Sequence, residues 1–287
     1  MSTLNNPFAP FDPDLATAFE ANINAALTED IGSGDWTAML LPASAQVNAR
    51  VVVREDAVLC GAPWFEGAMM QVDPKIRIEW LFAEGDLMPA NAEVCRINGP
   101  ARSLMTAERP ALNFLQLLSG VATATRDYVK IVEGTKAAIL DTRKTLPGLR
   151  LAQKYAVRVG GGQNQRLALY DGILIKENHI VAAGSIRAAM DAAHALRAGV
   201  SIQIEVESLE ELQQALDAGA VSVLLDNFST QMMREAVAMT AGRAVLEASG
   251  GVNRDSVRAI AETGVDRISI GSLTKDVVAT DYSLRVL

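Results

Sequence analysis

In the second half of the chain, charged residues directly follow apolar runs that are typical of β-strands. Lys176, Glu205 and Asp226 each end such a run, and Arg143 and Lys144 come three and four residues after another one. Lysine and arginine bind carboxylates and phosphates, whereas paired carboxylates suit a divalent metal or sugar hydroxyls. These residue types together predict a site for a small polyanion.

The elements that must bring these residues together form a repeating pattern. Six short apolar runs, several of them followed by a helical stretch, occupy residues 137–140, 172–175, 202–204, 221–225, 244–246 and 268–270. A strand–helix repeat builds a parallel β/α structure in which every strand's carboxyl end lies at the same edge. In a barrel of such units that edge is the catalytic mouth, so we expect the charged residues to be neighbours in space.

Small residues follow the last two runs. Ser249-Gly250-Gly251 and Ile270-Gly271-Ser272 stand where barrels often bind phosphate through backbone N–H groups, although simple turns are the alternative. Residues 160–166 form a glycine-rich loop that ends in Arg166 and lacks the spacing of a dinucleotide-binding or Walker loop. This loop is either an anion-binding element or an ordinary tight connection.

Other interpretations of single residues stay open. Glu205 and Asp226 could each pair with a neighbouring cation, for which Lys176 is the obvious partner. A lysine that ends a barrel strand could also form a Schiff base, which makes an aldolase the alternative enzyme. His179 could shuttle a proton or hold a structural hydrogen bond, and His194 fits the surface of a helix.

Composition limits the partners and the compartment. The chain has 287 residues and a net charge of −8, which argues against a nucleic-acid surface. Seven basic and only two acidic residues lie between Asp141 and Lys176, and a solvated helix face would account for Arg150, Lys154 and Arg158. The two cysteines predict reduced thiols. Since we find neither a membrane-length apolar run nor a secretory signal in residues 1–15, we expect a cytoplasmic protein.

The first part of the chain differs from the second. A helix is expected over residues 15–27, short antiparallel strands over 46–96, and a further helix beginning near Glu108-Arg109-Pro110 with the proline in its first turn. We place the domain boundary after Leu117. This gives a small domain at 1–117 and a barrel at 118–287.

Several long motifs are similar to those of one family. They are Ala26-Leu27-Thr28-Glu29-Asp30 with Gly34-Asp35-Trp36-Thr37, the segments 108–123 and 141–150, Lys176-Glu177-Asn178-His179, and the ends Glu205-Val206-Glu207, Leu225-Asp226-Asn227 and Ser249-Gly250-Gly251. In order and spacing the chain resembles quinolinate phosphoribosyltransferase over nearly its whole length. The resemblance implies an N-terminal α/β sandwich domain, whose packing the extreme C-terminal tail could join, and an open, incomplete α/β barrel. It also implies a homodimer in which each N-terminal domain caps the partner's barrel.

The activity that the resemblance implies is transfer of a phosphoribosyl group from 5-phosphoribosyl-1-pyrophosphate (PRPP) to quinolinate, with Mg²⁺ as cofactor. The products would be nicotinate mononucleotide, pyrophosphate and CO₂, on the de novo route to NAD. Both substrates are small anions, which agrees with the local excess of positive charge, and neither a nucleic acid nor a membrane is implied as a partner.

The resemblance also implies roles for individual residues. Arg143 and Arg166 would hold the quinolinate carboxylates, with Arg109 contributed by the partner subunit. Lys144 and Lys176 would neutralise the leaving pyrophosphate, and Glu205 and Asp226 would hold the metal and the ribose hydroxyls. The remaining substrate-binding residues would be Thr142, Gln165, Ser249, Gly250, Gly251, Ile270, Gly271 and Ser272.

One position departs from the family pattern. Gln165 stands where the family usually has histidine before the arginine of the glycine-rich loop. Glutamine can donate a hydrogen bond to a carboxylate but cannot supply a positive charge, so we expect activity with an altered affinity for quinolinate. Two alternatives remain: an enzyme of this family that acts on another aromatic acid, and a non-catalytic relative that binds an anionic metabolite. The presence of both charge signs together argues against the latter.

Overall fold

The computed structural model describes residues 13–287, so the interpretation that residues 1–15 carry no secretory signal falls almost entirely outside the described part. The chain forms two compact units. The first unit contains the chain up to Arg126 together with Thr145–Gly161 and Leu273–Leu287, and the second contains Asp127–Lys144 and Gly162–Ser272.

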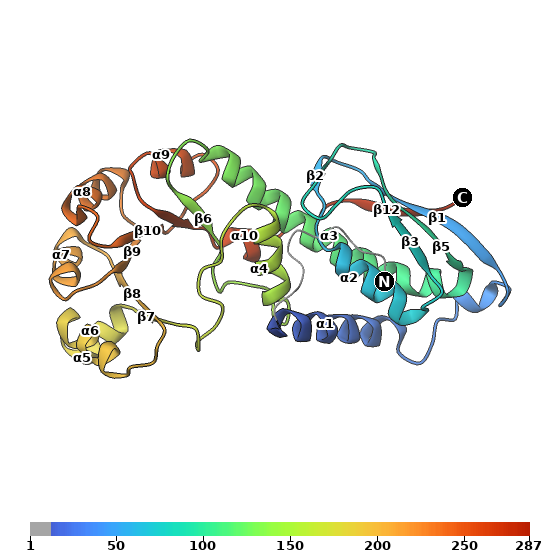
Figure 1. Cartoon of the computed structure of the whole chain (residues 1–287), viewed down its shortest axis with the longest axis horizontal. Helices are drawn as coiled ribbons and strands as arrows, with labels where there is room; N and C mark the ends of the chain where they lie inside the picture. The colour runs from blue at the N-terminus through green and yellow to red at the C-terminus, as the bar shows by residue number, and fades with distance from the viewer. Residues whose placement is uncertain (1–12) are drawn as a thin grey trace. The chain divides into compact units, whose positions relative to one another are not determined.

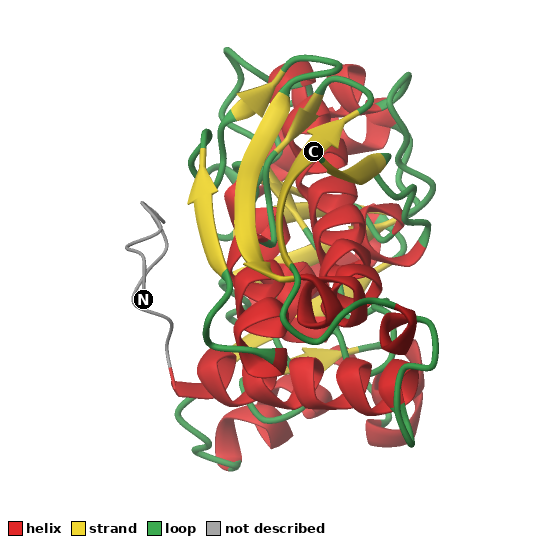
Figure 2. Cartoon of the chain, turned by 90° about the vertical axis from the view of Figure 1, so that its right-hand side faces the viewer, coloured by secondary structure: helices red, strands yellow, loops and turns green. Residues whose placement is uncertain are grey.

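The first unit contains a four-stranded antiparallel sheet in the order β12-β1-β5-β3 (Figures 1 and 2). Its strands are β1 (Gln46–Val53), β3 (Arg77–Trp80), β5 (Glu93–Pro100) and β12 (Tyr282–Val286). The short strands β2 (Ala57–Val58) and β4 (Leu87–Met88) pair separately. The antiparallel strands expected between residues 46 and 96 are therefore confirmed, and the last strand of the chain pairs with β1.

The first unit also contains helices. They are α1 (Pro13–Ile31), the 3₁₀ turn η1 (Ala38–Leu40), α2 (Ala62–Val72), most of α3 (Ala101–Ile131), α4 (Arg150–Val159) and most of α10 (Ser272–Lys275). The expected start of a helix near Pro110 is wrong, because α3 begins at Ala101 and carries Pro110 in its interior. Proline there removes one backbone donor, but the long buried face of α3 keeps the helix continuous, with Leu104, Leu112 and Leu115 almost fully buried.

Burial within the first unit follows from an apolar layer between its sheet and its helices. The core includes Trp64 and Phe65 of α2, Val51 and Val53 of β1, and Tyr155 of α4. The free cysteines Cys60 and Cys95 are also buried there, as the prediction of reduced thiols requires. Most of α4 is buried, including every residue from Ala152 to Val157. Lys154 is only 1% exposed, so the expected solvated face of this helix is wrong at that residue.

The second unit contains a parallel six-stranded sheet in the order β6-β11-β10-β9-β8-β7. Its strands are β6 (Ala138–Leu140), β7 (Gly172–Ile175), β8 (Ser201–Val206), β9 (Ser222–Asp226), β10 (Val245–Ser249) and β11 (Arg267–Ser269). The edge strands β6 and β7 do not pair with each other, so the barrel is open. The expected fold class, an α/β protein with an open barrel, is confirmed.

Helices cover the outer face of this curved sheet (Figure 1). They are α5 (Glu177–Ala183), α6 (Ile186–Ala195), α7 (Leu209–Asp217), α8 (Thr230–Thr240) and α9 (Val257–Ala261). Ser185, Ser208 and Ser229 accept backbone N–H bonds at the starts of α6, α7 and α8, which fixes where each of these helices begins. No described helix is long and apolar enough to cross a membrane.

The glycine-rich connection bonds to both edges of the open sheet. Gln163 forms a parallel bridge with Leu140 of β6, and its N–H donates to the Ile139 carbonyl at 2.8 Å. Three residues later, Nη1 of Arg166 donates to the Gly172 carbonyl at the start of β7, also at 2.8 Å. The connection therefore spans the gap between the edge strands.

Candidate active site

A cavity of about 340 Å³ opens at the carboxyl ends of the barrel strands, within the second unit. Nine residues that the sequence predicts for the site line it: Thr142, Arg143, Lys144, Gln165, Arg166, Lys176, Glu205, Asp226 and Ser249. Four further lining residues were not predicted: Leu174, Leu224, Glu247 and Ser269. The parallel topology thus brings together charged residues that lie far apart in the sequence, as expected.

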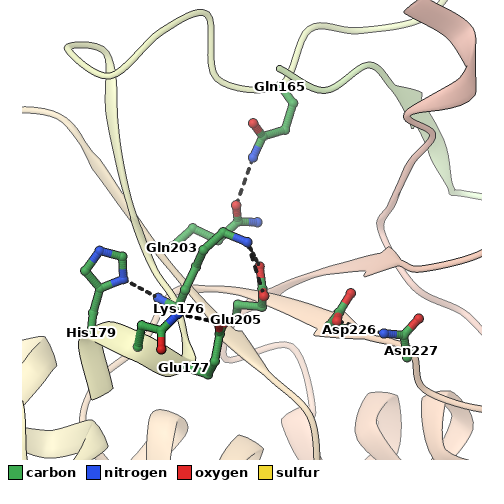
Figure 3. A network of polar contacts seen from close by, with 9 residues as sticks. Gln165, Lys176, Glu177, His179, Gln203, Glu205, Asp226 and Asn227 are labelled. Carbon is green, nitrogen blue, oxygen red and sulfur yellow. Dashed lines mark hydrogen bonds and ion pairs between the residues drawn. The ribbon is translucent and has the colours of Figure 1, made fainter. Parts of the chain in front are cut away.

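Lys176 and Glu205 form an ion pair at this mouth (Figure 3). Nζ of Lys176, at the end of β7, lies 2.9 Å from Oε2 and 3.3 Å from Oε1 of Glu205 on the neighbouring strand β8. The alternative interpretation of Glu205, in which it pairs with Lys176, is therefore confirmed. An ion-paired lysine whose side chain is 46% exposed is a poor Schiff-base nucleophile, because activation of that kind depends on burial away from counter-charges.

Asp226 ends β9 and is held by its neighbour instead of by a cation. Nδ2 of Asn227 donates to Oδ2 of Asp226 at 2.8 Å (Figure 3), and the Asn227 N–H donates to the Ser249 carbonyl at 3.0 Å. Gly250 lies so close that a Cβ there would be 2.1 Å from Oδ1 of Asn227. The ends of β9 and β10 are therefore fitted to each other, and the fit requires glycine at position 250.

The end of β11 meets the segment that follows β6. A Cβ on Gly271 would lie 3.1 Å from Cδ of Lys144 and 3.6 Å from Oγ1 of Thr142. Ile270 is 1% exposed, and its N–H donates to the Leu140 carbonyl at 2.9 Å. The Ile270 N–H is therefore already bonded within the sheet and is not available to an anion. In Ile270-Gly271-Ser272, only Gly271 and Ser272 stand at positions suited to binding one.

Arg143 and Arg166 lie near each other in the wall of the cavity. Burial, together with the like charge of Arg143, lowers the pKa of the Arg166 guanidinium, while Asp171 opposes the shift. Among residues 13–287, Nε of each arginine is a buried donor with no hydrogen-bond partner. Two guanidinium groups held near each other favour a ligand with two negative groups.

A buried carboxylate organises the loop that carries Arg166. Asp141, fully buried at the end of β6, accepts from Nδ2 of Asn164 at 2.6 Å and from the Gln165 N–H at 2.9 Å. In the sequence Asp141 directly follows the apolar run 137–140. Its contacts show that it shapes the loop and does not line the cavity.

Beneath the mouth, polar side chains form a connection that the sequence interpretation missed. Nε2 of Gln165 donates to Oε1 of Gln203 (Figure 3), and Nε2 of Gln203 donates to Oε2 of Glu247, each at 2.9 Å. Burial raises the pKa of Glu247, while the Gln203 hydrogen bond lowers it. The available signal was a polar residue at an inward position of an otherwise apolar strand, as in Ile202-Gln203-Ile204 and Leu246-Glu247-Ala248.

The histidines have local positions. Nδ1 of His179 accepts from the Lys176 N–H at 3.0 Å and so caps the start of α5 (Figure 3), which is the structural role considered for it. His194 is exposed near the end of α6, as expected. Arg109 is exposed on α3 in the first unit and belongs to a different part of the chain from the cavity.

The donor set limits how a metal could bind. Among the described residues there is no group of three or more His, Cys, Asp or Glu side chains that could hold one. Glu205 and Asp226 line the same cavity, and two carboxylates fit a Mg²⁺ ion that takes its other ligands from substrate phosphates and water. They do not fit an ion enclosed by protein ligands alone.

An open α/β barrel with cations and carboxylates at its carboxyl mouth defines an enzyme class that binds anionic small molecules. The comparison with known families is specific. The family profile "Quinolinate phosphoribosyl transferase, C-terminal domain" matches residues 121–285, and its N-terminal counterpart matches residues 35–119. The chain belongs to the quinolinate phosphoribosyl transferase family.

Individual relatives agree with this assignment. A probable nicotinate-nucleotide pyrophosphorylase (carboxylating) from Bacillus subtilis is 38% identical over 265 residues, which is 92% of each chain. The corresponding protein from Synechocystis is 41% identical over 85% of this chain and 84% of its own length. The structure of the nicotinate-nucleotide pyrophosphorylase from Francisella tularensis superimposes with a TM-score of 0.90 at 45% identity, covering 94% of this chain and 96% of that one.

Proposed function

We propose that the protein transfers the phosphoribosyl group of PRPP to quinolinate and releases CO₂, giving nicotinate mononucleotide and pyrophosphate for NAD biosynthesis. The observation that carries the proposal is the cavity in which Arg143, Lys144, Arg166 and Lys176 lie with Glu205 and Asp226. Membership of the family and the names of its relatives support this choice of substrates.

Arg143 and Arg166 bind the two carboxylates of quinolinate. Each guanidinium can donate two parallel hydrogen bonds to a carboxylate, and two of them match a dianion that carries its carboxylates on adjacent ring carbons. Gln165, at the same wall, contributes a carboxamide to this half of the cavity. Arg109 is the additional cation and comes from the partner subunit.

The donor substrate occupies the other half. Glu205 and Asp226 hold the ribose hydroxyls, and Lys144 and Lys176 neutralise the pyrophosphate. The phosphate groups lie among Thr142, Ser249, Gly250, Gly251, Gly271 and Ser272 at the ends of β6, β10 and β11, and Ile270 anchors the last of these turns through its bond to the Leu140 carbonyl. Glu205 and Asp226 would also be the residues that hold Mg²⁺, and when bound that ion would supply further neutralisation of the negative charge on the leaving group.

The chemistry consists of two bond exchanges. The pyridine nitrogen forms a bond to C1′ of the ribose as the bond from C1′ to the pyrophosphate oxygen breaks, and the pyrophosphate leaves with the electron pair. The carboxylate on the carbon next to the ring nitrogen then leaves as CO₂, and that carbon takes a proton from solvent. Carboxylates at Glu205 and Asp226 stabilise the positive charge that develops on the ribose, and the lysines stabilise the negative charge on the leaving group.

We further propose a cytoplasmic homodimer in which the domain of residues 1–117 caps the barrel of the partner. Arg109 lies on α3 and outside the unit that contains the cavity, so a contribution across a dimer would complete the set of cations around quinolinate. The extensive family resemblance of the segment around Arg109 supports a functional role for this exposed residue.

The direct test is a product assay. Purified protein, Mg²⁺, PRPP and carboxyl-labelled quinolinate are incubated, and labelled CO₂ and nicotinate mononucleotide are measured in equal amounts over time. Nicotinate in place of quinolinate is the matched control, because it has one carboxylate fewer. Turnover of another aromatic acid without turnover of quinolinate would reject the proposed substrate.

A further inference from the structure

A directed chain of hydrogen bonds runs from the substrate cavity into the barrel. The Gln165 carboxamide donates to Gln203, and Gln203 donates to Glu247, at 2.9 Å in each case. The three residues come from the glycine-rich connection, from β8 and from β10, so the chain of bonds links non-adjacent strands to the loop that carries Arg166.

The direction of these bonds follows from the last member. Glu247 accepts a hydrogen bond through Oε2 from the NH₂ group of Gln203, so that NH₂ group faces Glu247. The carbonyl oxygen of Gln203 then faces Gln165, which must present its own NH₂ group in return. Gln203 is 7% exposed and Glu247 is 1% exposed, so bulk water does not compete for these bonds.

The position of Gln203 indicates that it acts on a bound substrate indirectly and not by direct contact. Gln165 and Glu247 line the mouth cavity, but Gln203 does not. Gln203 lines a second cavity of about 540 Å³, whose wall includes Gly172, Ser201 and Val245 at the amino-terminal ends of their strands. A substrate in the mouth cavity can therefore respond to Gln203 only through a residue that both cavities share.

We propose that Gln203 and Glu247 are positioning residues that fix the orientation of the Gln165 carboxamide for binding the quinolinate carboxylate beside Arg166. This inference rests on the proposed function and adds to it. Gln165 stands where the family resemblance implies histidine, and its carboxamide has a donor end, the NH₂ group, and an acceptor end, the carbonyl oxygen. The buried carboxylate at Glu247 selects which end faces inward.

The test is a double-mutant cycle in the steady-state assay. Gln203→Met removes the central hydrogen bonds at similar volume and is expected to raise the KM for quinolinate about fivefold, the effect of one lost hydrogen bond. The kcat and the KM for PRPP are expected to stay within about twofold. In a Gln165→Met background, Gln203→Met is expected to have no further effect, because the carboxamide that it orients is gone.

Two further variants complete the test. Glu247→Gln keeps the volume and removes the charge that sets the direction, so it is expected to raise the KM for quinolinate at least about twofold even where Gln203→Met fails to fold. Thr263→Val removes a buried hydroxyl of the same unit that bonds only locally, to the Ile260 carbonyl, and it is expected to leave the KM unchanged.

The outcomes are distinguishable. Wild-type turnover of quinolinate combined with an unchanged KM in both Gln203→Met and Glu247→Gln overturns the positioning role alone. The same holds if the effect of Gln203→Met persists in the Gln165→Met background, or if Thr263→Val raises the KM equally. A wild-type protein that does not turn over quinolinate overturns the proposed function and this role together.

Discussion

Lys176 and Glu205 lie at the ends of the adjacent parallel strands β7 and β8, with Nζ of Lys176 2.9 Å from Oε2 of Glu205. The register of this strand pair, with Ile175 opposite Ile204, places the cation beside the carboxylate. The Lys176 side chain is 46% exposed and that of Glu205 is 10% exposed. An ion pair with an exposed lysine contributes little to stability. Its main effect is therefore to hold the two charged groups in place for the substrates.

The first prediction follows from that pair. Lys176→Met is expected to lower kcat by about 10²–10³ without unfolding the protein, because a preorganised cation that meets developing negative charge is lost. The matched control is Lys136→Met, which breaks the ion pair with Asp266 at 2.7 Å, just before the starts of β6 and β11 and away from the cavity. Equal losses of activity in the two variants, measured alongside thermal unfolding, would contradict the assignment.

The second prediction concerns the close contact between β9 and β10. Gly250→Ala is expected to raise the KM for PRPP at least about tenfold, because the new Cβ displaces Asn227, which bonds Asp226. The control is Gly242→Ala, since Gly242 also has a positive φ, +78°, but has open space around it. That control is expected to lose about 1 kcal/mol of stability and to keep the wild-type KM.

Much of this site could be predicted because its parts lie at strand ends. Parallel topology alone places Lys176, Glu205 and Asp226 at one mouth, whatever the intervening helices do. The contacts of buried side chains could not be predicted in the same way. Whether Lys154 lies on a solvated face depends on what packs over α4, and that information is not in the helical periodicity of residues 150–159.

The start of α3 illustrates the same limit. Local chemistry favours a proline in the first turn of a helix, so Pro110 indicated a start that the structure does not have. Tertiary burial of the helix outweighs the cost of one missing backbone donor. Likewise, Gln203 and Glu247 interrupt apolar strands, but only the three-dimensional structure shows that they bond to each other and to Gln165.

The third prediction restores the residue that is usual in the family. Gln165→His is expected to lower the KM for quinolinate severalfold at pH 6 and less at pH 8, because a protonated imidazole forms a charge-assisted bond to a carboxylate. The measurement is the KM for each substrate at both pH values, with PRPP as the internal control. An unchanged KM for quinolinate at both pH values would show that this position does not influence its binding.

The fourth prediction concerns stability. Glu84 is fully buried in the first unit, and burial raises its pKa to about 7 although it accepts from the Gly61 N–H at 2.7 Å and from the Tyr155 hydroxyl at 3.0 Å. In the unfolded chain its pKa is near 4.5. The folded state therefore binds a proton more tightly, so this contribution is fully present below pH 4.5 and is lost as the pH rises through 7.

The size of that contribution is about 3 kcal/mol, because each pKa unit corresponds to about 1.4 kcal/mol. The free energy of unfolding of the wild type is expected to fall between pH 5 and pH 8 by up to this amount relative to Glu84→Gln. Denaturant titrations across this range provide the measurement. Glu29→Gln, at an exposed position of α1, is the control and is expected to follow the wild-type pH dependence. If the free energies of unfolding of wild type and Glu84→Gln change in parallel with pH, the prediction for Glu84 is wrong.

The fifth prediction tests whether one active site needs two subunits. Arg109→Ala and Lys144→Ala are each expected to abolish activity while leaving the fold intact, because each removes a cation from the proposed substrate site. If Arg109 acts across a dimer, a mixed dimer contains one site with both defects and one site with neither. Mixing the two inactive variants under subunit exchange is then expected to restore up to about a quarter of wild-type activity, since about half of the dimers are mixed and each has one intact site. The same mixing with two Lys144→Ala preparations provides the control. If activity is not restored although mass measurement of the intact dimers shows mixed dimers, Arg109 serves the barrel of its own chain, and the shared-site arrangement is wrong.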